Sequence, residues 1–115
     1  MKISNYHDTE PIRDVEGVLK RDIIGTDDGA PNFTMRFFEV DTGSSTPSHS
    51  HPFEHEIFIL NGKGVVVGAQ GSIPIGKGSV IFIAPDEPHC IVNTGNEHLE
   101  FICVIPSPNE CSTEQ

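Results

Sequence analysis

The sequence predicts a single all-β domain, a sandwich or barrel of short strands. Three observations support this prediction. Apolar, β-branched runs recur every eight to twelve residues, turn-forming residues such as Gly, Pro and Asn separate them, and no stretch after residue 30 keeps a helical period. At 115 residues the chain has the size of one domain, and it is long enough to bury a core without a disulfide or a structural metal.

The expected strands follow one another with short turns between them. They cover residues 17–24, 33–40, 56–60, 63–67, 72–75, 80–83, 90–92 and 99–105. Residues 25–32 are dense with turn formers and are expected to form a loop. Asn61-Gly62 lies between two β-rich runs, which is the strongest short-range signal of a β-hairpin. Residues 1–14 are expected to form an extended arm and residues 106–115 a flexible tail.

The charge balance makes several partners improbable. Seventeen acidic residues against seven basic ones give a formal net charge of −10, which argues against nucleic acid and anionic membranes as partners. The N-terminus has no apolar core of the signal-peptide kind, and no apolar run reaches spanning length. Cys90, Cys103 and Cys111 form no CxxC pair; the first two lie in apolar strands and are expected to be small buried residues. A reducing cytoplasm fits this pattern best.

Four of the six histidines form a candidate metal site. His49 and His51 are two positions apart, so in an extended strand their side chains point to the same face. His55 opens the next apolar run, and His89 stands before another short apolar strand far along the chain. Imidazole nitrogens suit divalent first-row metals such as zinc, copper, iron and nickel. We therefore predict a metal ion held by His49, His51, His55 and His89.

Two motifs in this order resemble those of the cupin family, small β-barrels of the jelly-roll type. The first motif is matched by Gly43, His49, His51, Glu56 and Gly62, with five rather than six residues in the last gap. The second is matched by Gly78, His89 and Asn93, with Ala84 and Asp86 where Pro and Gly are usual. Two motifs in the right order are far more specific than either alone. The resemblance implies a jelly-roll barrel and, for cupins of this size, a homodimer.

His55 and Glu56 compete for one place in the resemblance. Many cupins carry a Glu four positions after the second histidine of the first motif, and this sequence has His55 there, with Glu56 one residue later. Adjacent residues of a strand point to opposite faces, so only one of the two can reach the metal. The sequence HSHPFEHEIF looks like the small four-histidine cupins, and we favour His55 over Glu56.

The remaining candidates receive structural interpretations. Asn93 is expected to close a hydrogen bond within a turn, Glu54 to face solvent, and His7 and His98 to be ordinary surface residues. Five phenylalanines alternate with other apolar residues; most of them are expected to fill the barrel, and one or two could line a pocket beside the metal: Phe37, Phe38, Phe58, Phe82 and Phe101.

Four neutral imidazoles would leave the charge of a divalent ion uncompensated by the protein. Such a site should take a small anion or a chelating pair of oxygens, as in an oxalate-like acid, an enediol or a catecholate. Manganese, iron, nickel, zinc and copper all stay open as the metal. The sequence favours a metal-dependent oxidoreductase or dioxygenase-like enzyme, with decarboxylation or isomerisation as variants. The alternative is a non-catalytic cupin that binds or senses a small ligand through the same metal.

Overall fold

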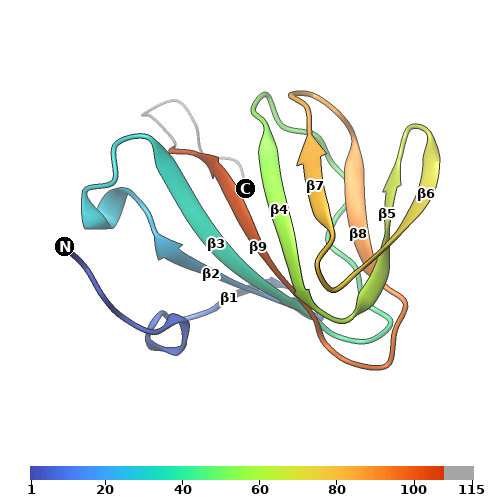
Figure 1. The fold of residues 1–115 in the computed structure, drawn as a ribbon, viewed down its shortest axis with the longest axis horizontal. Helices are drawn as coiled ribbons and strands as arrows, with labels where there is room; N and C mark the ends of the chain where they lie inside the picture. The colour runs from blue at the N-terminus through green and yellow to red at the C-terminus, as the bar shows by residue number, and fades with distance from the viewer. Residues whose placement is uncertain (108–115) are drawn as a thin grey trace.

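In the computed structural model, which describes residues 1–107, nine strands form two antiparallel sheets around a common core (Figure 1). The larger sheet has the order β1 (Ile12–Val15), β2 (Val18–Ile24), β3 (Phe33–Val40), β9 (Leu99–Pro106), β4 (His55–Asn61) and β7 (Val80–Ile83). The smaller sheet has the order β6 (Gly71–Gly76), β5 (Lys63–Gly68) and β8 (His89–Asn93). Two 3-10 turns cover Tyr6–Asp8 and Thr26–Asp28. The predicted all-β, jelly-roll fold is confirmed, and each end of the eight expected strands lies within one residue of its observed place.

The core lies between the sheets, and the strand β9 shows how alternation builds it. In β9 every second residue is buried, namely Leu99, Phe101, Cys103 and Ile105. Ile91 of β8 meets this row from the opposite sheet. Fully burying such a side chain stabilises the fold by about 1.5–3 kcal/mol. The position of the strands is thus fixed by a period of two in the apolar residues.

The predicted hairpin at Asn61-Gly62 is wrong, because within residues 1–107 no ladder joins β4 to β5. β4 pairs with β7 and β9, whereas β5 pairs with β6 and β8. A register shift between Ile59 and Asn61 bends the end of β4, and Gly62 follows with φ +94°. A Cβ on Gly62 would lie 2.6 Å from the carbonyl oxygen of His98, so only glycine fits against β9. The turn signal marks a corner where the chain changes sheets.

The phenylalanine prediction holds only in part. Phe101 is buried between the sheets and stacks on Phe38, with ring centroids 4.9 Å apart. Phe37 is also buried, but Phe58 and Phe82 are 47% and 61% exposed. Since the residues on either side of Phe58 are the buried ones in β4, its ring points outward. Phe58 and Phe82 therefore belong to the outer face of the larger sheet and do not fill the barrel.

Both ends of the described part of the chain, residues 1–107, pack against the larger sheet. Tyr6 stacks on Phe37 at 4.2 Å between centroids, and the predicted arm ends in strand β1, which pairs with β2. At the other end β9 continues through Pro106, and Ser107 N–H donates to the carbonyl oxygen of Asn32 at 2.9 Å. The rest of the predicted tail at 106–115, with Cys111, lies outside the described residues. Neither 3-10 turn within residues 1–107 has the length or apolarity to cross a membrane.

Candidate functional site

The chain between β3 and β4 crosses to the smaller sheet and fixes the first two histidines beside β8. Ser45 forms an isolated bridge with Val92, and His49 forms one with His89. The prediction that His49 and His51 project from one strand is wrong, because His49 makes only this single bridge and His51 lies in irregular chain. The prolines that flank the pair lack the amide hydrogen that a ladder needs.

The four predicted histidines nevertheless lie together. The centroid of the His51 ring is 4.3 Å from that of His49, 5.2 Å from that of His55 and 6.4 Å from that of His89. The His89 centroid is 5.0 Å from that of His55 and 5.9 Å from that of His49. Rings that share one ion have their centres roughly 3.2 Å from it, and so at most about 6.5 Å from one another. All five distances fall within that limit.

The four rings do not have the geometry of a complete metal-coordination site. Within residues 1–107, no group of three or more His, Cys, Asp or Glu side chains is arranged to hold a metal ion. The site therefore fits a metal in the chemistry of its donors and in the spacing of its rings, and not in a completed coordination geometry.

Strand alternation separates His55 from Glu56. His55 is 4% exposed and lines a cavity between the sheets together with His49 and His89. Glu56 is exposed and lies with Phe58 on the outer face of the larger sheet. Of the two residues, only His55 reaches the cavity.

Hydrogen bonding prepares His89 to bind through its far nitrogen. Nδ1 of His89 lies 2.9 Å from the carbonyl oxygen of Glu87. A carbonyl can only accept, so in the neutral ring Nδ1 carries the hydrogen and Nε2 keeps the lone pair. Histidine ligands of metals are commonly oriented by such a bond. Nδ1 of His55, in turn, is buried and has no hydrogen-bond partner within residues 1–107.

Burial in the site favours the neutral forms of His55 and His49. Burial, followed by the charges of His89, Arg36, His51 and His49 in that order, lowers the pKa of His55 to about 3. Burial, followed by the charge of His89, also lowers the pKa of His49. Imidazole must be neutral to bind a metal, so both shifts favour the form that a ligand needs.

Phe53, which the sequence analysis did not single out, supports two of the rings. It stacks on His51 with centroids 4.9 Å apart and planes 8° apart, and its centroid lies 5.3 Å from that of His55. The sequence signal that could have identified Phe53 is the presence of an aromatic residue within a histidine-rich loop. Phe53 also packs against the core.

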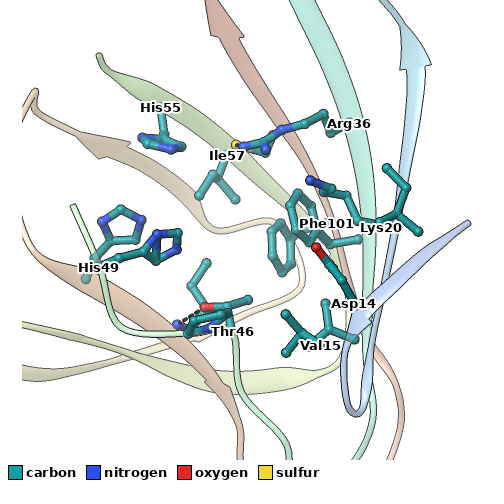
Figure 2. A pocket seen from close by; sticks show the side chains of 16 residues that line it. Asp14, Val15, Lys20, Arg36, Thr46, His49, His55, Ile57 and Phe101 are labelled. Atoms are coloured by element: carbon teal, nitrogen blue, oxygen red, sulfur yellow. Dashed lines mark hydrogen bonds between the residues drawn. The ribbon is translucent and has the colours of Figure 1, made fainter. Parts of the chain in front are cut away.

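The cavity has a volume of about 330 Å³ and opens between the sheets (Figure 2). Its apolar wall includes Ile57, Phe101 and Phe38, and its opposite end carries the histidine rings. Such a space suits a small molecule of a few heavy atoms that is bound at one polar end.

Two buried cations also line this cavity, and the sequence analysis missed both. Lys20 is 6% exposed and Arg36 is 3% exposed. Each lies at an inward position of its strand, as the burial of Val18 and Val40 two and four residues away indicates. Both faces of β3 carry large apolar residues, so the sequence does not reveal on which face Arg36 lies.

The remaining predicted residues lie away from the cavity. Asn93 is 1% exposed and makes three hydrogen bonds of 2.8–2.9 Å, to Val40 O, Glu97 O and Gly95 N, which confirms its structural role. Glu54 is exposed, as expected. His98 is exposed and pairs with Asp41 at 3.1 Å, and His7 is exposed near the N-terminus.

Comparison with known proteins gives relatives of several activities. Over 64 residues the chain is 47% identical to an oxalate-binding protein of Thermotoga maritima, covering 55% of this chain and 53% of that protein. The chain thus spans about half the length of this curated relative. The polyketide cyclase RemF of Streptomyces resistomycificus superposes with a TM-score of 0.87 at 34% identity, covering 96% of this chain and 82% of that one.

A second solved structure, a predicted oxalate decarboxylase of Thermotoga maritima, superposes with a TM-score of 0.78 at 30% identity. That match covers 93% of this chain and 100% of the other. Residues 36–105, which contain both motifs and all four histidines, match the family description of the cupin domain. The chain belongs to the cupin family.

Proposed function

We propose that the protein binds a divalent transition metal through His49, His51, His55 and His89, and acts on a small oxygen-rich molecule in the adjoining cavity. The observation that carries this proposal is the gathering of four imidazole rings: five of the six distances between their centroids are 4.3–6.4 Å, and His49, His55 and His89 line that cavity. When bound, the ion would supply a Lewis acid or, if redox-active, a centre that brings substrate and dioxygen together.

The chain's own residues would orient the ligand and exclude water. Ile57, Phe38 and Phe101 form an apolar wall, which strengthens electrostatic interactions inside the cavity. The bond from His89 Nδ1 to the Glu87 carbonyl would hold that ring with Nε2 available. Glu54 and Glu56 are exposed, and neither is among the residues that line the cavity within residues 1–107. No carboxylate next to the histidines is therefore assigned as a general base.

The relatives support a ligand with carbonyl or carboxylate oxygens. One is named for oxalate binding, one for oxalate decarboxylation and one for polyketide cyclisation. The oxalate-binding relative also supports the second candidate function, in which this site binds a small acid and releases it unchanged.

Elemental analysis of the purified protein tests the metal, and turnover tests the function. We expect close to one transition-metal ion per chain. Metal-loaded protein is then incubated with oxalate, a keto acid or a catechol while dioxygen and the organic compound are both followed. Loss of the compound supports the enzyme, and recovery of a bound but unchanged compound supports the binding protein. A fully folded protein that takes up no divalent metal would refute the proposal.

A further inference from the structure

The inner face of the larger sheet carries two positive charges that the histidine site does not require. Lys20 on β2 and Arg36 on β3 line the same cavity as the histidines. Lys and Arg side chains are almost never fully buried unless they are paired. The partners of the two side chains therefore decide whether this cavity holds an uncompensated charge, and Arg36 is the one with a buried orphaned nitrogen within residues 1–107.

Arg36 lacks an anionic partner within residues 1–107. No carboxylate lies within 4.0 Å of its guanidinium there, and its Nε is buried without a hydrogen-bond partner. Its Nη2 donates to Sγ of Cys103 at 3.4 Å. Burial raises the pKa of the Cys103 thiol, so this sulfur is not a counter-charge. Leaving a buried guanidinium in this state is costly unless a ligand compensates it.

Lys20 is affected by charges of both signs. Burial lowers its pKa first and the charge of Arg36 second, while Asp22 and Asp14 act in the opposite direction. Of these two carboxylates only Asp14 lines the cavity, and it is exposed. Arg36, and not Lys20, is therefore the cation of this cavity that lacks a carboxylate partner within residues 1–107.

The guanidinium is held in a fixed direction. Arg36 pairs in register with Cys103 of β9, which pairs with Ile57 of β4, so its side chain lies along a row that leads toward β4. The ring of Phe38 supports it from one side, with the guanidinium carbon 5.1 Å from the ring centroid. In Figure 2 the guanidinium points across the cavity toward His55.

We propose that Arg36, with Lys20 beside it, binds a carboxylate group of the ligand whose other oxygens face the histidines. The ligand class is a short acid with two oxygen-bearing ends, such as a dicarboxylate or a keto acid. Arg36 offers Nε and its terminal nitrogens in the fork geometry that matches a carboxylate. The inference about the histidine end rests on the proposed function, whereas carboxylate binding at Arg36 needs no metal.

Calorimetric titration of the full chain tests the proposal, first after removal of metal by a chelator. Malonate is the probe, and malonamide, which has nearly the same shape without charge, is its control. We expect malonate to bind the metal-free protein and malonamide not to bind. Arg36→Met should weaken malonate binding about ten- to a hundredfold, as the loss of a charge-assisted hydrogen-bonded pair predicts. Arg13→Met, which removes an exposed arginine of β1, should change it less than about twofold.

The outcomes separate this inference from the proposed function. Equal affinity of Arg36→Met and wild type for malonate would overturn the inference, even if the protein holds a metal. Equal affinity of metal-free wild type for malonate and malonamide, or no binding of either, would also overturn it, and this measurement needs no variant. If Arg36→Met does not fold, Lys20→Met replaces it, with an expected loss of at least threefold; no loss counts against the proposal. Malonate binding by a protein without metal affinity would sustain the inference and refute only the metal site.

Discussion

His49 and His89 are joined through their backbones as well as through their rings. The amide nitrogen of His49 donates to the carbonyl oxygen of His89 at 3.2 Å, and that of His89 donates to the carbonyl of His49 at 3.1 Å. This reciprocal pair ties the first histidine motif to the second across forty residues of chain. The spacing of the rings is thus set by hydrogen bonds that do not involve the rings.

Two hydrogen bonds between Thr46 and Ile91 lie next to the His49–His89 bridge, and removing one of them should destabilise the protein. We call these two bonds the Thr46 clip. Thr46 N–H donates to Ile91 O, and Thr46 Oγ1 accepts from Ile91 N, both at 2.9 Å. Thr46→Val keeps the shape but leaves Ile91 N–H without its acceptor, so we expect a loss of about 1–3 kcal/mol in the free energy of unfolding. Urea unfolding measures it. Thr94→Val, at an exposed threonine, should change it by less than about 0.5 kcal/mol, and an equal loss in both variants would contradict the role of the clip.

The proposed metal site predicts opposite effects on metal content for substitutions of His51, in the loop before β4, and Glu56, in β4. His51→Ala should reduce metal content sharply after dialysis against a limiting metal solution, because it removes a proposed ligand. Glu56→Gln should leave metal content near the wild-type value, since Glu56 lies on the outer face. Inductively coupled plasma analysis of both variants, with circular dichroism to confirm folding, makes the measurement. The reverse ranking would show that Glu56 is the ligand.

The strands were predictable from sequence because apolar, β-branched runs lie between turns rich in glycine and proline, and residues of β4, β8 and β9 alternate with a period of two. The pairing between strands was not predictable from sequence, as the wrong hairpin prediction at Asn61-Gly62 shows. A glycine with φ +94° serves a hairpin and a corner between sheets equally well, and the choice depends on the contact with His98 across the fold. The homodimer stays a prediction, which light scattering of the purified protein would measure.

The candidate site was predictable where a motif fixes the residue type and obscure elsewhere. His49 and His89 could be related only through two motifs, since no local pattern reports a bridge between distant segments. Arg36 escaped notice because Phe37 and Phe38 make both faces of β3 look apolar. Its role follows from burial and from the absence of a carboxylate partner within residues 1–107, and neither is visible in a sequence.

Asn93 should be required for folding and not for ligand binding. Its side chain is 1% exposed and joins Val40 and Glu97 carbonyls to the amide of Gly95. Asn93→Ala removes three hydrogen bonds and leaves buried backbone groups unsatisfied, so we expect a loss of about 2–4 kcal/mol in the free energy of unfolding. Asn96→Ala, at an exposed asparagine of the same turn region, is the matched control and should be nearly neutral. Thermal and urea unfolding of both variants provide the measurement; a stable Asn93→Ala protein would contradict this assignment.

The lowered pKa of His55 predicts how metal-free protein responds to acid. Between its ordinary pKa of 6.5 and the folded-state value of about 3, the unfolded chain binds a proton at His55 that the folded chain does not. Stability should therefore be unaffected by this group above pH 6.5 and should fall as the pH drops below it, by up to about 1.4 kcal/mol per pH unit. His49, whose pKa is also lowered, acts in the same direction.

The test compares wild type with His55→Gln, whose amide does not titrate. Urea unfolding of both metal-free proteins from pH 8 to pH 4 gives the difference in free energy, in which the titration of the carboxylates largely cancels. We expect that difference to be constant from pH 8 to 7 and then to shift toward the variant as the pH falls. A difference that stays constant down to pH 4 would mean that the folded protein protonates His55 as readily as the unfolded chain does. The cavity would then admit enough water to solvate an imidazolium, and the water exclusion on which the proposed chemistry depends would be lost.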